Sequence, residues 1–100
     1  MRVQRTTAND RMQQLADLFH QTAEDHHAAY AATDGVDPEW AIWYSERLLE
    51  QGIEQILDAK LLKSDLIYLL VLADKQQSTD APGGRWERYY ADFFLSRYRK

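Results

Sequence analysis

The sequence is poor in the residues that interrupt helices or form disulfides. It contains no cysteine, and its 100 residues include only four glycines and two prolines. The lack of cysteine excludes disulfides, thiolate nucleophiles and every cysteine-based zinc or iron–sulfur site. The scarcity of glycine and proline permits long uninterrupted helices, and no strand-type alternation of apolar and polar residues occurs. We therefore predict an all-α fold.

The sequence also lacks a long apolar run and an excess of positive charge. Its longest apolar run, residues 66–73, is far shorter than the roughly 20 residues that cross a membrane. The first ten residues are polar and lack the apolar core of a secretory signal. The net charge of −4 argues against a nucleic-acid partner, because phosphate binding depends on clustered Lys and Arg. We expect a cytoplasmic protein that contacts neither membranes nor nucleic acids.

The usual catalytic signatures are missing as well. The sequence has no glycine-rich phosphate loop, no Gly-x-Ser-x-Gly elbow and no His-Glu-x-x-His zinc motif. Its four serines have no histidine nearby in the sequence. We therefore predict no catalytic residue and no cofactor, and we favour a non-enzymatic role.

The residues that are present suffice for one hydrophobic core. Hydrophobic residues make up 45% and charged residues 28% of the chain, which is typical of globular proteins. We predict a single domain over residues 1–100, with frayed ends at about 1–7 and 98–100. Apolar residues three and four positions apart predict the following helices: 8–32, 37–57, 65–76 and 85–98. The expected architecture is a compact bundle of four to five helices with mostly antiparallel neighbours.

Local signals mark the ends of these helices. Asp37 can cap the second helix, since Pro and Glu follow it at the first helical positions. Thr7 and Ser64 are candidate caps of the first and third helices, and Gly35 suits a left-handed helix end. Gly52 either bends or ends the second helix, because glycine costs about 1 kcal/mol relative to alanine inside a helix.

The two C-terminal helices are rich in large apolar side chains. In the third helix these side chains lie almost all round, which predicts burial on most sides: Leu66, Ile67, Leu69, Leu70, Val71 and Leu72. In the last helix five aromatic residues share one face: Trp86, Tyr89, Tyr90, Phe93 and Phe94. Large rings most often fill a core, but exposed ones mark a dimer or partner interface. These five residues are our candidate interface.

One flank of the first helix carries a possible metal-ligand pattern. His20, Glu24 and His27 are spaced by four and three residues, which places them on the same side of a helix. Imidazole and carboxylate groups so arranged can bind a transition metal, with Asp17 or a carboxylate from another helix completing the site. The alternative is a solvated polar flank without a ligand.

His26 differs from its neighbours because it falls within the apolar stripe of the first helix. A half-buried imidazole there needs a hydrogen-bond partner, so a structural histidine in the core is one interpretation. The other is a small-molecule pocket with the following lining: His26, His27, Tyr30, Asp34, Trp40, Trp43, Tyr44 and Arg47. Arg47 could hold an anionic ligand or stack on a Trp. Alternatively, it pairs with Asp34 or Asp37 as a structural bridge.

Residues 26–44 resemble a signature of small bacterial proteins. They read HHxxYxATDGxDPEWxxWY, and further runs at residues 64–66 and 86–90 are similar to the later helices of these proteins. The resemblance spans about residues 12–95. It implies an all-helical fold and cytoplasmic residence, and it implies no activity and no catalytic residue.

Two functional hypotheses follow from these patterns. The first is a non-enzymatic module that acts through protein contacts, as a homodimer or with another protein partner. The second is a small-molecule or metal-binding protein that uses the helix bearing His20, Glu24, His26 and His27 beside the stretch 40–47.

Overall fold

The described part of the chain is built from helices and contains no strand. The computed structural model describes residues 8–34, 36–80 and 85–98. Its elements in chain order are α1 (Ala8–Ala29), the 3-10 turn η1 (Ala31–Thr33), α2 (Trp40–Glu50), α3 (Ile53–Leu57), α4 (Lys63–Asp80) and α5 (Trp86–Arg97). The predicted all-α fold is confirmed.

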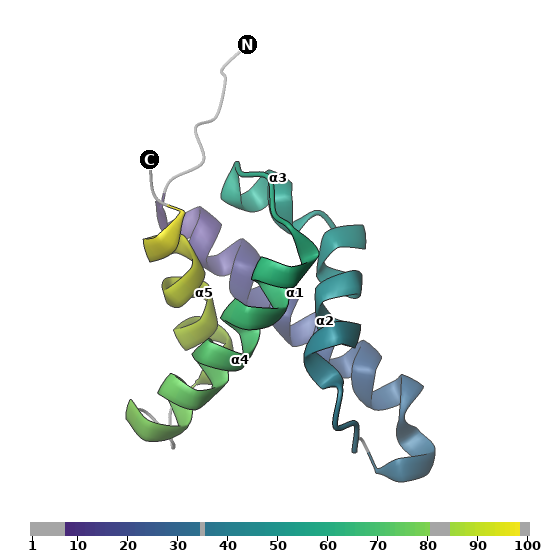
Figure 1. Cartoon of the computed structure of the whole chain (residues 1–100). Helices are drawn as coiled ribbons and strands as arrows, with labels where there is room; N and C mark the ends of the chain where they lie inside the picture. The colour runs from purple at the N-terminus through teal and green to yellow at the C-terminus, as the bar shows by residue number, and fades with distance from the viewer. Residues whose placement is uncertain (1–7, 35, 81–84, 99–100) are drawn as a thin grey trace.

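Four of the helices form a closed arrangement in which each contacts two others. α1 packs against α2 and α5, and α4 packs against the same two helices. Figure 1 shows that these neighbours run antiparallel, with α4 in front of α1 and the short α3 at one end. The end of α1 and the start of α2 diverge from the α4–α5 pair toward the lower right. The predicted compact bundle with antiparallel neighbours is therefore confirmed.

The core lies between these helices and contains large side chains from all of them. Phe19 of α1, Leu48 of α2, Ile53 of α3, Leu70 of α4 and Phe94 of α5 are each fully buried. Each such side chain stabilises the fold by about 1.5–3 kcal/mol relative to an exposed position. Buried side-chain nitrogen and oxygen atoms of the described residues all have hydrogen-bond partners. A mainly apolar core, whose described buried polar side chains are all hydrogen-bonded, therefore holds the helices together.

Gly52 ends α2 rather than bending it. Its backbone φ is +93°, a left-handed conformation that residues with a Cβ rarely adopt. α3 begins directly after it and ends before Asp58, whose φ of 54° is left-handed too. The apolar spacing of the predicted second helix thus continues to Leu57 across two helices, with a change of direction between them.

The structure also changes two other predicted boundaries: the first helix ends before residue 32, and the second begins at Trp40 rather than at residue 37. α1 ends at Ala29, and the 3-10 turn follows it before Asp34, which adopts the left-handed conformation with φ 55°. The predicted helix ends at Thr7 and Gly35 lie outside the described residues.

The third predicted helix is longer than its sequence signals indicate. α4 begins at Lys63, so Ser64 lies inside the helix, and it continues past residue 76 to Asp80. No Gly or Pro interrupts residues 77–80, and the Thr79 hydroxyl donates to the Lys75 carbonyl oxygen at 3.1 Å. Within the described ranges, no helix combines the length and apolarity needed to cross a membrane.

Candidate functional site

His26 lies at the centre of an aromatic cluster between α1 and α2. The residue is only 7% exposed. Its ring stacks on Tyr30 with centroids 4.7 Å apart and contacts Trp43 and Tyr44 at 5.1 and 5.2 Å. Trp40 in turn packs edge-on against Tyr44 at 5.3 Å. Five of the eight predicted pocket residues therefore meet, and they do so by packing their rings against one another.

The polar partner of His26 is Asp37, which lies just before the turn that leads into α2. His26 Nε2 lies 3.1 Å from Asp37 Oδ2, and both side chains are 9% exposed. Asp37 Oδ1 accepts the backbone N–H of Glu39 at 3.0 Å and so closes a turn before α2; the predicted cap at Asp37 is wrong, because α2 begins at Trp40 with Glu39 at its N-cap position and without a side-chain cap. Burial alone would raise the pKa of Asp37, but the bonds from His26 and from the Glu39 N–H outweigh it and lower that pKa. His26 and Asp37 thus tie the end of α1 to the start of α2.

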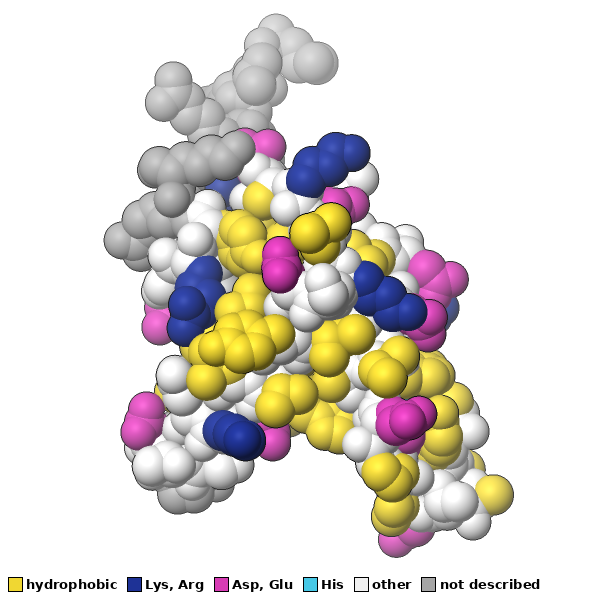
Figure 2. All heavy atoms as spheres, in the orientation of Figure 1, with side chains coloured by type: hydrophobic (Ala, Val, Ile, Leu, Met, Phe, Trp, Pro, Cys, Tyr) yellow, Lys and Arg dark blue, Asp and Glu magenta, His cyan; other side chains and the backbone are white. Residues whose placement is uncertain are grey.

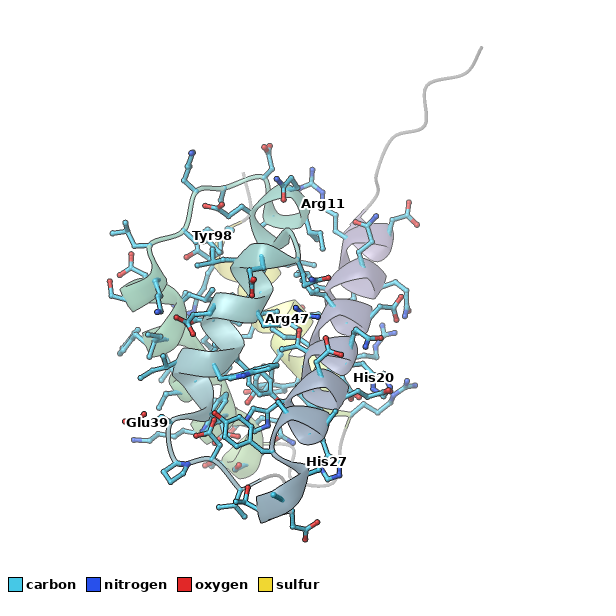
Figure 3. All side chains as sticks on the ribbon, turned by 90° about the vertical axis from the view of Figure 1, so that its right-hand side faces the viewer. Arg11, His20, His27, Glu39, Arg47 and Tyr98 are labelled. Atoms are coloured by element: carbon cyan, nitrogen blue, oxygen red, sulfur yellow. The ribbon has the colours of Figure 1, made fainter. Side chains whose placement is uncertain are left out.

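The other three predicted pocket residues lie outside this cluster. Arg47 bonds to Asp25, with Nε and Nη2 at 3.1 and 3.0 Å from the same carboxylate oxygen. The expected bridge from Arg47 to Asp34 or Asp37 is therefore wrong. Where α1 packs against α2, Asp25 of α1 lies within bonding distance of Arg47 and takes that role. Asp34 and His27 are exposed. Figure 3 shows Arg47 between α2 and α1, and His27 on the outer side of α1.

His20 joins α1 to α5 through two carboxylates, and we name His20, Glu24 and Glu87 the α1–α5 clasp. His20 Nε2 lies 2.6 Å from Glu24, and Nδ1 lies 3.0 Å from Glu87. A neutral imidazole donates from one nitrogen only, so both contacts together favour the imidazolium form. The hydrogen bond to Glu87 is the main reason why the pKa of His20 is raised. Burial would raise the pKa of Glu87, but the hydrogen bond from His20 and the other favourable contacts of the Glu87 carboxylate outweigh burial and lower that pKa.

A shallow hollow of about 390 Å³ lies beside this clasp, between α1 and α5. Its lining is His20, Ala23, Glu24, His27, Ala28, Trp86 and Glu87. The predicted metal ligands His20, Glu24 and His27 all border it, but both nitrogens of His20 are already bonded to carboxylates. Across residues 8–34, 36–80 and 85–98, no group of three His, Asp or Glu side chains is placed to hold a metal ion. The predicted metal site thus gains no support.

Sequence reasoning missed Trp86 and Glu87 as neighbours of His20. They are more than 60 residues away in the chain, and only the packing of α5 on α1 brings them together. No local spacing could have revealed this contact.

Most of the predicted aromatic interface belongs to the core. Tyr90, Phe93 and Phe94 are at most 9% exposed, because α5 packs against α1 and α4. Phe19 of α1 contacts Tyr90 and Phe94 with ring centroids 5.5 Å apart in both pairs. Trp86 and Tyr89, the other two residues, are half-buried. Large rings at this end of the chain therefore stabilise the bundle rather than cover its surface.

Two exposed large apolar side chains lie close together on α4. Tyr68 is 64% and Val71 is 37% exposed, so the predicted burial of this helix on most sides is wrong at Val71. We name the following residues, spaced three and four apart, the outward face of α4: Asp65, Tyr68, Val71, Leu72 and Lys75. Of these, Leu72 lies at the margin of the face, since it is half-buried and also packs against the core. Ile42 of the neighbouring α2 is 39% exposed. Figure 2 shows hydrophobic side chains grouped on the side of the molecule where α4 faces the viewer.

Comparisons with known proteins add no relative to this description. The chain matches no protein family, no curated protein and no solved structure. The resemblance of residues 26–44 to small bacterial proteins therefore stays a prediction. Function has to be inferred from the three regions described above: the His26 cluster, the α1–α5 clasp and the outward face of α4.

Proposed function

We propose that this protein is a small helical interaction module that associates with a second copy of itself through the outward face of α4. The observation that carries the proposal is the 64% exposure of Tyr68 beside Val71 on one helix face. Removing apolar surface from water stabilises a complex by about 25 cal/mol per Å². Exposed tyrosines flanked by aliphatic side chains are typical contact residues of protein interfaces.

The surface around Tyr68 has the layout of an interface. α2 packs beside α4, and the Ile42 side chain of α2 is exposed as well. At one margin Lys63 bonds to Glu46 at 2.7 Å, which links the two helices with a charged pair. An apolar centre with a charged margin is the usual arrangement in protein–protein contacts.

The other two regions are occupied by contacts within the molecule. His26 and Asp37 join α1 to α2, and His20 and Glu87 join α1 to α5. Their polar groups therefore serve the fold, whereas the outward face of α4 directs apolar groups to solvent. This difference favours an interaction module over a catalyst or a ligand-binding protein.

A second copy of the chain is the partner that the proposal names. Closed two-fold dimers are the commonest assemblies of soluble proteins, and they need only one self-complementary face. The absence of cysteine fits a reducing cytoplasm, where we expect the dimer to form. The net charge of −4 makes nucleic acid an improbable partner for this face.

Sedimentation velocity of the wild type and of two charge variants tests this function. We expect the wild type to change from an 11.7 kDa monomer to a dimer as its concentration rises. Tyr68→Glu should weaken the dimer by at least about 30-fold, because it places two charges in the apolar centre. Circular dichroism should be unchanged, since Tyr68 is exposed.

Val36→Glu is the matched control for this experiment. Val36 is 66% exposed, close to the value for Tyr68, but it lies between η1 and α2, away from α4. We expect this variant to associate like the wild type. A wild type that stays monomeric at every concentration would refute the proposal. An equal loss of dimer affinity in Tyr68→Glu and Val36→Glu would refute it as well.

A further inference from the structure

We infer that the second copy packs its own α4 antiparallel to the first, with Asp65 of each copy opposite Lys75 of the other. This inference rests on the proposed function and specifies its geometry. The two charges lie at opposite ends of the outward face of α4, ten residues and therefore about 15 Å apart along the helix. Tyr68, Val71 and Leu72 lie between them.

Both charges are available for a partner. Asp65 and Lys75 are exposed, and the charge of Asp65 also acts on the nearby Tyr98 at the end of α5. Among the described residues, ion pairs join Lys63 to Glu46 and Arg47 to Asp25, and none engages Asp65 or Lys75. Asp74 and Asp80, the other acidic residues of α4, accept the hydroxyls of Tyr90 and Tyr89 of α5 at 3.3 and 3.1 Å. The face thus presents one negative end, an apolar middle and one positive end.

Antiparallel pairing makes this face complementary to itself. A two-fold axis that crosses the outward face of α4 at the level of residue 70 places Asp65 opposite Lys75 twice. The reason is that both residues are five positions from that level. The same axis places Tyr68 opposite the half-buried Leu72 of the other copy, so that the ring meets the part of that side chain left at the surface. A parallel arrangement would instead place Asp65 against Asp65 and Lys75 against Lys75, which is repulsive. The charges therefore set the direction and the register of the contact.

These ion pairs determine specificity more than affinity. They lie at the rim of the contact, where solvent and salt screen them, while the apolar middle supplies most of the binding energy. A shift of one copy by one helical turn would retain apolar contact but would separate both pairs. Opposite charges at the two ends therefore select one register among several that apolar contact alone allows.

Charge reversal at each end tests the inference. In Asp65→Lys, each copy presents two positive ends, and in Lys75→Asp, each presents two negative ends. We expect each single variant to weaken its own dimer roughly tenfold at low salt, with a smaller effect at high salt. The double variant, which carries Asp65→Lys and Lys75→Asp together, restores the pairs in reverse and should dimerise like the wild type.

An equimolar mixture of the two single variants is the sharpest arm of the experiment. One copy with two positive ends and one copy with two negative ends can form both ion pairs. The heterodimer should therefore be more abundant than either homodimer. Labelling one variant with ¹⁵N lets native mass spectrometry separate the three species. Asp65 lies in the first turn of α4, so its replacement also weakens that helix slightly. Recovery in the double variant and in the mixture shows the charge pairing in spite of that loss.

The outcomes separate this inference from the proposed function. If the wild type dimerises and Tyr68→Glu abolishes dimerisation, but the charge variants and their mixture behave like the wild type, the antiparallel register is overturned and self-association stands. If the single variants are weakened and neither the double variant nor the mixture recovers, the register is overturned as well. If the wild type does not dimerise, both the function and the register fail.

Discussion

At the scale of single residues, His20 makes the stability of the fold depend on pH. Its imidazolium donates to Glu24 on its own helix and to Glu87 on α5. These contacts raise the pKa of His20 above its ordinary value of 6.5 and lower that of Glu87 below 4.5. The His20 contribution to stability is present below pH 6.5 and is lost as the pH rises through the raised pKa. The Glu87 contribution is present above pH 4.5 and is lost on acidification, so the α1–α5 clasp is strongest between these values.

His20→Gln should therefore flatten the pH dependence of stability. We expect the free energy of unfolding of the wild type to fall between about pH 6 and pH 8, and that of the variant to fall less. Urea unfolding at several pH values measures the unfolding free energy of both proteins. The protein concentration is kept low enough that neither protein dimerises. His27→Gln is the control, because it removes an exposed histidine from the same helix, and it should keep the wild-type slope. An equal slope in the wild type and His20→Gln would show that the clasp contributes nothing.

Sequence spacing located His26 more successfully than it located the neighbours of His20. His26 lies in the apolar stripe of α1, so its burial and its need for a polar partner could be predicted, and Asp37 fills that need. Its aromatic neighbours follow from helical periodicity within a single hairpin of α1 and α2. The contact between His20 and Glu87 joins the first and last helices, 67 residues apart in the sequence. Residue spacing carries no information about contacts between residues so far apart in the chain. Local patterns therefore revealed the local cluster only.

At the scale of elements, Gly52 determines where α2 stops and α3 begins. Its φ of +93° places it in a region that strains any residue with a Cβ. A Cβ at this position would come 2.8 Å from the end of the flexible Gln55 side chain, which can move away. Backbone strain, rather than steric contact, is therefore the main obstacle to substitution.

Gly52→Ala should lower the free energy of unfolding by about 1–2 kcal/mol. The reason is the left-handed backbone, which alanine adopts only at a cost. Gly52→Asn is the matched comparison, since asparagine tolerates this conformation better and should lose less. Urea unfolding measures both variants. A Gly52→Ala protein as stable as the wild type would mean that the junction of α2 and α3 relaxes without strain.

Helix positions were predictable from the sequence to within a few residues, but helix ends depended on tertiary structure. The predicted start at Asp37 lies three residues before Trp40, where α2 begins, because the Asp37 carboxylate bonds to the backbone N–H of Glu39 and closes a turn instead of capping the helix. Ser64 did not cap α4, since the helix had already begun at Lys63, whose side chain bonds to Glu46 of α2. The exposure of Val71 could not be read from composition, because an apolar helix does not reveal which of its sides remains uncovered.

At the scale of the whole molecule, α4 leaves part of its apolar surface uncovered by the described helices. α2 and α5 flank it, and its buried side chains Leu66 and Leu70 face the core. Tyr68 and Val71 are left on the outside, between Asp65 and Lys75. The four helices thus enclose the core and leave, on α4, a face that one further helix can cover. An α4 from a second copy supplies that helix in our account.

Cross-linking of single cysteines tests this account most directly, because the natural chain has no cysteine. Residue 71 lies next to the expected two-fold axis, so the two copies of Val71→Cys are separated by only about 3 Å along the helices. Thr79→Cys changes an exposed residue of the same helix, and its two copies are about 27 Å apart along the helices. With a short bis-maleimide cross-linker at a concentration where the wild type is dimeric, we predict a covalent dimer for Val71→Cys and a monomer for Thr79→Cys. No covalent dimer at residue 71, or equal amounts at both positions, would contradict the pairing of α4 with α4.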